Sequence, residues 1–254
     1  KEYLKNINYF VNEFKTNKEI WIEIGFGSGR HILHQAKLNP NIQFIGLEIH
    51  TPSIEQMLKQ AKIQNINNIL AINYDARLFM EFLQSNSVGK IFVHFPVPWD
   101  KKPHRRIYSH KFIQEALRVL KIDGSLELRT DSENYYEFCS NLLSHYNNVD
   151  IQKNKELDIS SKYEDRWKKQ GKNIYDLTLI AKENSKTKNN SFKFDFEEKI
   201  DFKNLKKYLN KNSIVKDDFF VHFEDILINK NDSNSGLIGV TFGNFNAPVT
   251  KYIL

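Results

Sequence analysis

Residues 20–30, IWIEIGFGSGR, join a short apolar stretch to three glycines at alternate positions. Branched and aromatic side chains up to Ile24 predict a buried strand, and the glycines predict a tight turn after it. Glycine allows positive φ and lets a ligand approach main-chain atoms that a Cβ would cover. A dinucleotide-binding turn places its third glycine three residues beyond the second. Here Gly29 follows Gly27 by only two residues, so no pyrophosphate is implied.

Acidic residues lie at the ends of the first three predicted strands. Glu23 lies just before the turn, Glu48 is near the end of a second predicted strand at residues 41–49, and Asp75 follows a third at residues 68–73. A carboxylate in the position of Glu48 can accept hydrogen bonds from both ribose hydroxyls, and Asp75 can accept one from an adenine amine. Taken singly, such residues are more often polar strand ends. Together, after a glycine turn, they predict a nucleoside cofactor site.

Strand and helix patterns alternate along the first part of the chain. Further strands are expected at residues 91–95 and 124–129, and one arm of a final hairpin at residues 173–180. Helices are expected at residues 29–38, 51–64, 76–83, 109–120 and 132–146. This alternation predicts an α/β fold with a doubly wound, mostly parallel sheet and with sites at the carboxyl ends of its strands.

A rigid, basic loop follows the fourth predicted strand. Two prolines on either side of Val97 remove two backbone donors and fix two φ angles, and Trp99 comes next. The cations of the loop are Lys101, Lys102, Arg105 and Arg106. A basic run is most often a solvated surface. An aromatic residue and a stiff frame beside the cations favour contact with a polyanion that has exposed bases.

The acidic residue before the glycine turn resembles the pattern of class I S-adenosylmethionine-dependent methyltransferases. The motif HFPVPWDKKPHRR at residues 94–106 is more specific. Together with LRTD at residues 128–131 and SKYEDR at residues 161–166, it resembles the bacterial tRNA (guanine-N7)-methyltransferase family over residues 18–182. The resemblance implies a Rossmann-like class I methyltransferase fold, S-adenosylmethionine as cofactor, tRNA as partner, and 7-methylguanine in the tRNA variable loop as product.

The resemblance also implies roles for single residues. Cofactor contacts fall on Glu23, Glu48 and Asp75, and we expect Gly25, Gly27, Gly29 and His94 to complete that site. Substrate contacts fall on Lys101, Asp131, Ser161, Tyr163 and Glu164, and we expect Arg105, Arg106 and Arg166 to add to them. Two positions depart from the family pattern, since Val97 stands where Asp is usual and Ser161 where Thr is usual.

The chemistry decides how much Val97 matters. Guanine N7 already carries an in-plane lone pair, and its methylation releases no proton from the base, so no general base is needed. The reaction needs N7, the methyl carbon and sulfur in line within a dry site. A carboxylate can still stabilise the positive charge that grows on the purine. Asp100, three residues beyond Val97, is therefore the candidate catalytic residue.

The same chemistry limits how guanine can be recognised. A cation that donates to both O6 and N7 would occupy the lone pair that must attack. Lys101 is therefore expected to contact O6 or a neighbouring phosphate, and Asp131 or Glu164 to accept hydrogen bonds from N1 and N2 of the base. Asp131 could instead cap the helix that begins near residue 132.

Composition agrees with a polyanionic partner. The 254 residues include 37 basic and 31 acidic ones, which gives a net charge of +6 and a pI of about 9.1. Cys139 is the single cysteine, which excludes an internal disulfide, and the histidines lack zinc-type spacing, so no metal is expected. No apolar run approaches membrane length and no signal peptide is recognisable, so no membrane association is expected and the cytoplasm is the expected location. The chain begins at Lys1 rather than at Met, as a fragment would.

Composition shifts near residue 183. A solvated linker is expected at residues 183–191, between a methyltransferase domain at residues 1–182 and a small C-terminal α+β domain at residues 192–254. In the C-terminal domain, strands are expected at residues 192–196, 219–228 and 237–242, a helix at residues 202–210 and a hairpin loop at residues 231–236. The role of this domain is left open between tRNA binding, self-association and packing.

Three other functions remain open. A methyltransferase for rRNA or a small molecule would keep the cofactor site but would leave the basic loop without a purpose. A non-enzymatic RNA-binding protein on a relic methyltransferase fold is suggested by Val97. A nicotinamide dehydrogenase is disfavoured by the spacing of the glycines.

Overall fold

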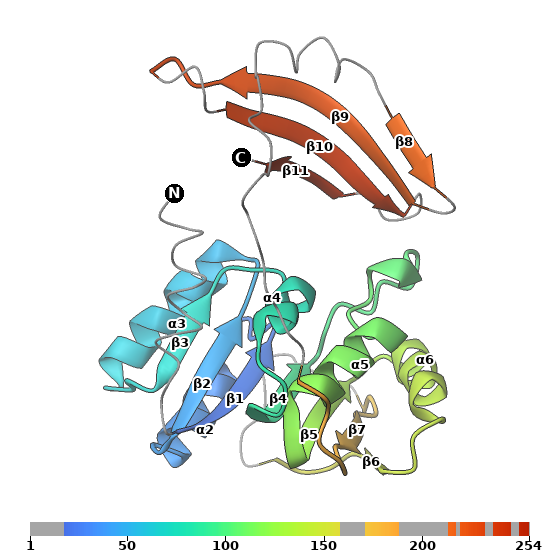
Figure 1. Cartoon of the computed structure of the whole chain (residues 1–254). Coiled ribbons are helices and arrows are strands. Elements are labelled where there is room, and N and C mark those ends of the chain that lie inside the picture. Colours follow the sequence, from blue (N-terminus) through green and yellow to red (C-terminus); the bar gives the residue numbers. More distant parts are fainter. Residues whose placement is uncertain are drawn as a thin grey trace. The chain divides into compact units, whose positions relative to one another are not determined.

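The computed structural model describes residues 18–157, 171–187, 213–216, 219–231, 236–244 and 249–253. The chain divides into two units, residues 1–190 and residues 191–254. In the described residues the first unit contains a seven-stranded sheet with its helices, and the second contains a four-stranded sheet (Figure 1).

The sheet of the first unit has the strand order β3-β2-β1-β4-β5-β7-β6. Its strands are β1 (Glu19–Ile24), β2 (Ile42–Leu47), β3 (Ile69–Ile72), β4 (Val88–His94), β5 (Leu120–Thr130), β6 (Val149–Lys153) and β7 (Tyr175–Ile180). β1 to β5 are parallel, whereas β7 is antiparallel to β5 and β6 is antiparallel to β7. The direction of winding reverses between β1 and β4, the place where open α/β sheets bind ligands outside the carboxyl ends of their strands.

Helices cover both faces of this sheet. They are α2 (Arg30–Leu38), α3 (Thr51–Ile63), α4 (Ala76–Phe82), α5 (His110–Val119) and α6 (Glu133–Leu143), and a 3₁₀ turn spans Pro103–Arg105. Phe44 of β2 packs with Ile32 of α2 and Met57 of α3 on one face. Ile45, the next residue of the strand, belongs to the core of the opposite face together with Met80 of α4. The expected doubly wound, mostly parallel α/β fold is therefore confirmed.

Helix α5 shows how local sequence fixes an element. Ser109 caps it, because its hydroxyl accepts a hydrogen bond from the backbone N–H of Phe112 at 3.2 Å. The residues at helical spacing, Phe112, Ile113, Ala116 and Val119, are buried. β5 begins directly at Leu120, four residues before the expected start, because the chain turns from helix to sheet without a loop. On α6, Cys139 is a buried free thiol, as expected, and burial raises its pKa to about 12.

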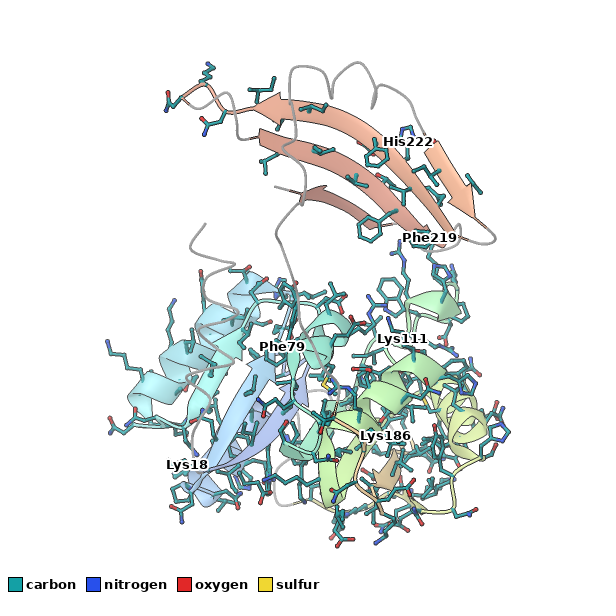
Figure 2. All side chains as sticks on the ribbon, in the orientation of Figure 1. Lys18, Phe79, Lys111, Lys186, Phe219 and His222 are labelled. Carbon is teal, nitrogen blue, oxygen red and sulfur yellow. The ribbon has the colours of Figure 1, made fainter. Side chains whose placement is uncertain are left out.

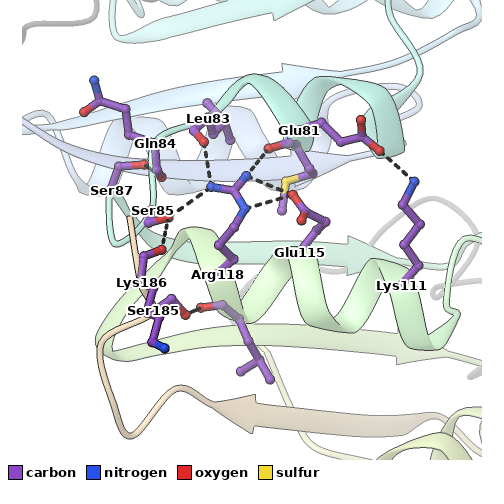
Figure 3. A network of polar contacts seen from close by, with 12 residues as sticks. Glu81, Leu83, Gln84, Ser85, Ser87, Lys111, Glu115, Arg118, Ser185 and Lys186 are labelled. Carbon is purple, nitrogen blue, oxygen red and sulfur yellow. Dashed lines mark hydrogen bonds and ion pairs between the residues drawn. The ribbon is translucent and has the colours of Figure 1, made fainter. Parts of the chain in front are cut away.

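The chain that leads toward the second unit is attached to the first unit as far as Lys186. Asn86 and Ser185 exchange two hydrogen bonds, from Asn86 Nδ2 to the Ser185 carbonyl at 2.8 Å and from the Ser185 N–H to Asn86 Oδ1 at 2.9 Å. Ser85 Oγ donates to the Lys186 carbonyl at 2.9 Å (Figure 3). Within the expected linker at residues 183–191, Ser185 and Lys186 are thus hydrogen-bonded to the first unit, and residues 188–191 lie outside the described residues.

The second unit contains an antiparallel sheet in its described residues, with the order β11-β10-β9-β8. The strands are β8 (Ser213–Lys216), β9 (Phe219–Ile228), β10 (Gly236–Asn244) and β11 (Val249–Ile253). The two strands expected at residues 219–228 and 237–242 are confirmed and form the expected hairpin, and β8 and β11 are additional. The expected strand at residues 192–196 and helix at residues 202–210 lie outside the described residues.

None of the helices in the described part of the chain is long and apolar enough to cross a membrane. Within the same residues, His, Cys, Asp and Glu side chains do not gather in groups of three or more that could hold a metal ion.

Candidate functional site

The three glycines form a left-handed turn at the carboxyl end of β1. Gly25, Gly27 and Gly29 have φ angles of 70°, 51° and 77°, a region that residues with a Cβ rarely adopt. Among the described residues beyond its chain neighbours, a Cβ on Gly25 or on Gly27 would meet no atom within 4 Å, so this side of the turn opens onto space that a ligand can enter. A Cβ on Gly29 would lie 2.2 Å from Cγ of Met57. Gly29 therefore lets α2 pack against α3, whereas Gly25 and Gly27 form a cradle.

Glu48 lies beside this cradle, as expected. Its Oε2 accepts a hydrogen bond from the Gly27 N–H at 3.0 Å, and its Oε1 accepts from the N–H groups of Ile49 and His50 at 2.8 and 3.0 Å. Three backbone donors thus fix the carboxylate at the open side of the turn. Because a carboxylate oxygen can accept two hydrogen bonds, Oε2 can also accept one from a ribose hydroxyl. The cradle and this carboxylate fit the nucleoside end of S-adenosylmethionine.

Glu23 is buried at the same strand end and contacts a histidine that the sequence analysis did not select. Glu23 is 3% exposed, and its Oε2 lies 2.7 Å from Nδ1 of His31 in the first turn of α2. The ring of His31 lies 4.3 Å from the ring of His94, centre to centre, at the end of β4. Burial lowers the pKa of His94 well below its usual value, and the charges of His31 and Arg129 lower it further. His94 is therefore neutral at physiological pH.

Asp75 lies at the carboxyl end of β3, as expected, but its carboxylate contacts Arg77. It caps α4 by accepting from the Arg77 N–H at 2.9 Å, and its Oδ2 accepts from Arg77 Nη2 at 2.7 Å. Partial burial acts to raise the pKa of Asp75, but the hydrogen bonds and the charge of Arg77 outweigh it and lower the pKa. An adenine amine at Asp75 would have to share this carboxylate with Arg77.

The basic loop begins next to the glycine turn, because Ile24 of β1 and Val93 of β4 are partners in the sheet. The Phe95 N–H donates to the Arg129 carbonyl of β5 at 2.7 Å, which attaches the start of the loop to the neighbouring strand. Phe95 and Trp99 both have positive φ angles, 49° and 47°. The loop thus begins at the same edge of the sheet as the cradle.

The side chains of the loop divide into exposed and buried ones. Lys101 and Arg105 are exposed, and Arg105 Cζ lies 5.1 Å from the ring centre of Trp99. Val97 is 60% exposed. Arg106 differs, because its guanidinium stacks on the rings of Tyr135 and Phe138 of α6, and only 7% of its side chain is exposed. Neighbouring protein groups thus cover the cation of Arg106, which disfavours the expected contact between Arg106 and substrate.

Asp100, the expected catalytic residue, faces Arg106. Its Oδ1 lies 3.3 Å from Nη2 of Arg106, although half of its side chain is exposed. An ion pair reduces the negative field that a carboxylate can offer to a reacting purine. The geometry therefore supports a contact within the loop for Asp100 better than a catalytic role.

Asp131 follows β5, next to the loop, since Arg129 of β5 pairs with His94 of β4. Its side chain is 18% exposed, and Oδ2 lies 3.5 Å from Nζ of Lys172. Ser132, not Asp131, caps α6, because Ser132 Oγ accepts from the Tyr135 N–H at 3.3 Å. The alternative capping role of Asp131 is thereby wrong. The expected substrate residues Ser161, Tyr163, Glu164 and Arg166 lie outside the described residues.

Known proteins resemble this chain in sequence and in fold. A sequence model of the family described as "Putative methyltransferase" matches residues 17–177. The chain is 47% identical to a Wolinella succinogenes protein named tRNA (guanine-N(7)-)-methyltransferase, over 99% of this chain and 64% of that protein. It is 43% identical to a Helicobacter hepaticus protein of the same name, again over 99% and 64%. The chain thus spans slightly less than two thirds of the length of these curated relatives.

A solved structure titled "Structure of an Antibiotic Related Methyltransferase" superposes with a TM-score of 0.52 at 16% identity, over 68% of this chain and 94% of that one. This likeness concerns the fold alone, and it agrees with the class I methyltransferase fold expected from the motifs. The family model covers more than half of the chain, and the named relatives carry the name of the family that the sequence motifs resemble. The chain therefore belongs to the methyltransferase family that this model describes.

Proposed function

We propose that this chain transfers a methyl group from S-adenosylmethionine to N7 of a guanine in the variable loop of tRNA. The observation that carries the proposal is the position of two features on adjacent strands. The open glycine turn with Glu48 ends β1, and the loop that carries Lys101 and Arg105 ends β4. A small donor and a polyanionic acceptor would therefore meet at one edge of the sheet. The names of the relatives support tRNA as the acceptor.

The donor would lie in the cradle of Gly25 and Gly27, with its ribose at Glu48. When bound, S-adenosylmethionine supplies an electrophilic methyl group on a sulfonium. Glu48 is well suited to orient the ribose, because three backbone N–H groups already fix its carboxylate. The Glu23 carboxylate, hydrogen-bonded to His31, lies at the end of β1 next to the glycine turn and would help to hold this turn in place.

The methyl transfer depends little on acid–base groups of the protein. The N7 lone pair forms the new bond to carbon, the carbon–sulfur bond breaks, and its electron pair stays on sulfur, which leaves a neutral thioether and a positively charged purine. Because no proton leaves the base, Val97 is compatible with activity. What the protein must supply is alignment and exclusion of water, and this depends on how the rigid loop and the glycine turn are held together.

Guanine recognition would use groups that leave N7 free. Lys101 is exposed and can contact O6 or a phosphate, and Asp131 has the partial exposure that a base-recognising carboxylate needs. Ser161, Tyr163, Glu164 and Arg166 remain proposed substrate contacts on the family resemblance alone. With tRNA as substrate, the enzyme would act in the cytoplasm.

A direct test uses purified protein, tRNA that lacks the modification and a radiolabelled methyl donor. We expect label in tRNA, and we expect chain cleavage at a single variable-loop guanine after reduction and aniline treatment, which cleaves at 7-methylguanine. Label that appears in rRNA, or in tRNA without aniline cleavage, would refute the assignment to guanine N7.

Two observations favour a second function, a non-enzymatic RNA-binding protein on the same fold. Val97 replaces the usual Asp, and the Asp75 carboxylate already contacts Arg77. Calorimetry with S-adenosylmethionine and with unmodified tRNA separates the two functions. Binding of tRNA together with no binding of the donor would favour this alternative.

A further inference from the structure

The basic loop contains one arginine that points inward. We propose that Arg106 is a positioning residue, which sets the shape of the substrate loop from inside the protein and does not itself bind tRNA phosphate. The inference rests on the proposed function only in naming tRNA as the substrate of the loop. The conformational role follows from contacts within the protein.

The first support is the set of contacts that Arg106 makes. Its Nε donates to the Pro98 carbonyl at 2.7 Å, and its Nη2 donates to Asp100 Oδ1 at 3.3 Å. The guanidinium carbon lies 4.6 Å from the ring centre of Phe138 and 5.3 Å from that of Tyr135. One side chain thus connects the tip of the loop to helix α6.

The second support is the lack of backbone donors in the loop. Pro96 and Pro98 have no N–H, so this part of the chain cannot stabilise itself with a regular set of backbone hydrogen bonds. Trp99, which follows Pro98, has a φ of 47°, where a residue with a large side chain is strained. A conformation of this kind persists only where surrounding contacts enforce it. The hydrogen bond from Arg106 to the Pro98 carbonyl is such a contact.

The third support is the contrast with the neighbouring cations. Lys101 and Arg105 are exposed and can reach a phosphate, whereas only 7% of the Arg106 side chain is exposed. Arginine suits the inner position because its planar guanidinium can stack on aromatic rings and donate in several directions at once, whereas the lysine ammonium cannot stack in this way. The proposal therefore predicts that lysine cannot replace arginine at position 106.

The experiment compares two substitutions at each of two neighbouring positions, Arg106→Lys and Arg106→Gln with Arg105→Lys and Arg105→Gln. Affinity for unmodified tRNA and kcat/KM are measured at several salt concentrations. Both Arg106 variants should lose on the order of 10- to 100-fold in kcat/KM, since misplaced reacting groups cost about this much. Arg105→Gln should lower the slope of log affinity against log salt by about 0.7 to 0.9, the effect of one phosphate contact, and Arg105→Lys should keep more of the slope.

Arg118 provides a control that is matched in chemistry. It is a second arginine with little exposed side chain, 11%, whose Nε donates to Glu115 at 2.9 Å and whose Nη atoms donate to the carbonyls of Met80 and Leu83 at 2.8 Å (Figure 3). It lies at the α4–α5 contact, where Lys111 of α5 (Figure 2) also pairs with Glu81 at 2.8 Å (Figure 3). Arg118→Lys should lower the melting temperature but leave the KM for tRNA close to that of the parent protein.

A readout that needs no activity comes from Trp99. In a Trp21→Phe, Trp167→Phe background, fluorescence and acrylamide quenching report on Trp99 alone. Arg106→Lys should shift the emission and increase quenching, and Arg118→Lys should do neither. If the parent protein does not methylate tRNA, the proposed function fails, while the Trp99 signal still tests Arg106. The inference is overturned if Arg106→Lys keeps the parent emission and the parent kcat/KM, or if Arg118→Lys loses as much in kcat/KM as Arg106→Lys.

Discussion

The Nδ1 atom of His31 lies 2.7 Å from Oε2 of Glu23, a carboxylate that is 3% exposed. Replacement of His31 by Ala would leave this buried carboxylate without its histidine partner, which typically costs about 1–3 kcal/mol. We expect the free energy of unfolding, measured by urea denaturation, to fall by that amount. His50→Ala is the matched control, because His50 makes a hydrogen bond to Ser53 at an exposed position. Equal losses in the two variants would contradict a special role for the His31–Glu23 contact.

Substitutions at two glycines of the turn should have different effects, one mainly on ligand binding and the other mainly on stability. Gly27→Ala places a methyl group in space that the described residues beyond its chain neighbours leave open to 4 Å, so it should weaken binding of S-adenosylhomocysteine roughly tenfold, or about 1.4 kcal/mol. Gly29→Ala forces a Cβ against Met57 and should cost an additional 1–3 kcal/mol or so in stability from overpacking. Both variants share the cost of a positive φ, about 1–2 kcal/mol. Calorimetry and urea denaturation of the two proteins measure the contrast, and a larger loss of ligand affinity in Gly29→Ala would reverse the assignment.

The sequence was sufficient to predict that the glycine turn and Glu48 lie together at one edge of the sheet. The glycine spacing and the carboxylates near the strand ends are local patterns, and the parallel alternation of strands and helices brings the ends of β1 and β2 together. Glu48 therefore lies at the turn, as predicted, with the Gly27 N–H at 3.0 Å. The contact of Asp75 with Arg77 could have been suspected, because an Asp before a helix often caps it and a cation two residues later is within reach.

The contacts of Arg106 and His31 could not be predicted in the same way. A run of four cations looks solvated in sequence, and the rings that cover Arg106 belong to α6, well beyond the loop. Their approach depends on how α6 packs beside β5, which periodicity does not specify. No local pattern marks His31, which follows the left-handed turn in sequence and contacts Glu23 of β1 across it. Tertiary packing, rather than local pattern, decides both cases.

The depressed pKa of His94 predicts loss of stability in acid. Burial, together with the charges of His31 and Arg129, keeps the folded pKa well below 6.5, so the unfolded chain binds a proton that the folded protein does not. The stability that neutral His94 contributes is fully present above the unfolded pKa, near pH 6.5. It is lost as pH falls below that value, by up to about 1.4 kcal/mol per pH unit. Between pH 7.5 and pH 5, the free energy of unfolding measured by urea denaturation should change less with pH for His94→Gln than for the parent protein. His145→Gln, at an exposed position, should leave the dependence as it is, and an unchanged slope in His94→Gln would exclude this group as its source.

Asp131 should determine how strongly the protein prefers guanosine to inosine, which lacks the N2 amine of guanine. If its carboxylate accepts hydrogen bonds from N1 and N2, a tRNA with inosine at the target position loses one charge-assisted hydrogen bond, worth about 1.5–3 kcal/mol, while its N7 stays nucleophilic. The parent protein should therefore prefer guanosine by roughly 10- to 100-fold in kcat/KM, because 1.4 kcal/mol is about tenfold.

In Asp131→Ala the ratio of the two kcat/KM values should approach one, because the carboxylate that senses N2 is gone. Glu133→Ala is the control, since Glu133 is an acidic neighbour that accepts a hydrogen bond from Tyr175 at 3.1 Å. It should keep the parent ratio even if its stability falls. A change in rate that is equal for both tRNAs in Asp131→Ala would mean that Asp131 acts through its ion pair with Lys172 on the shape of the site, and not on the base. The ratio is the decisive quantity because any general loss of folded protein cancels from it.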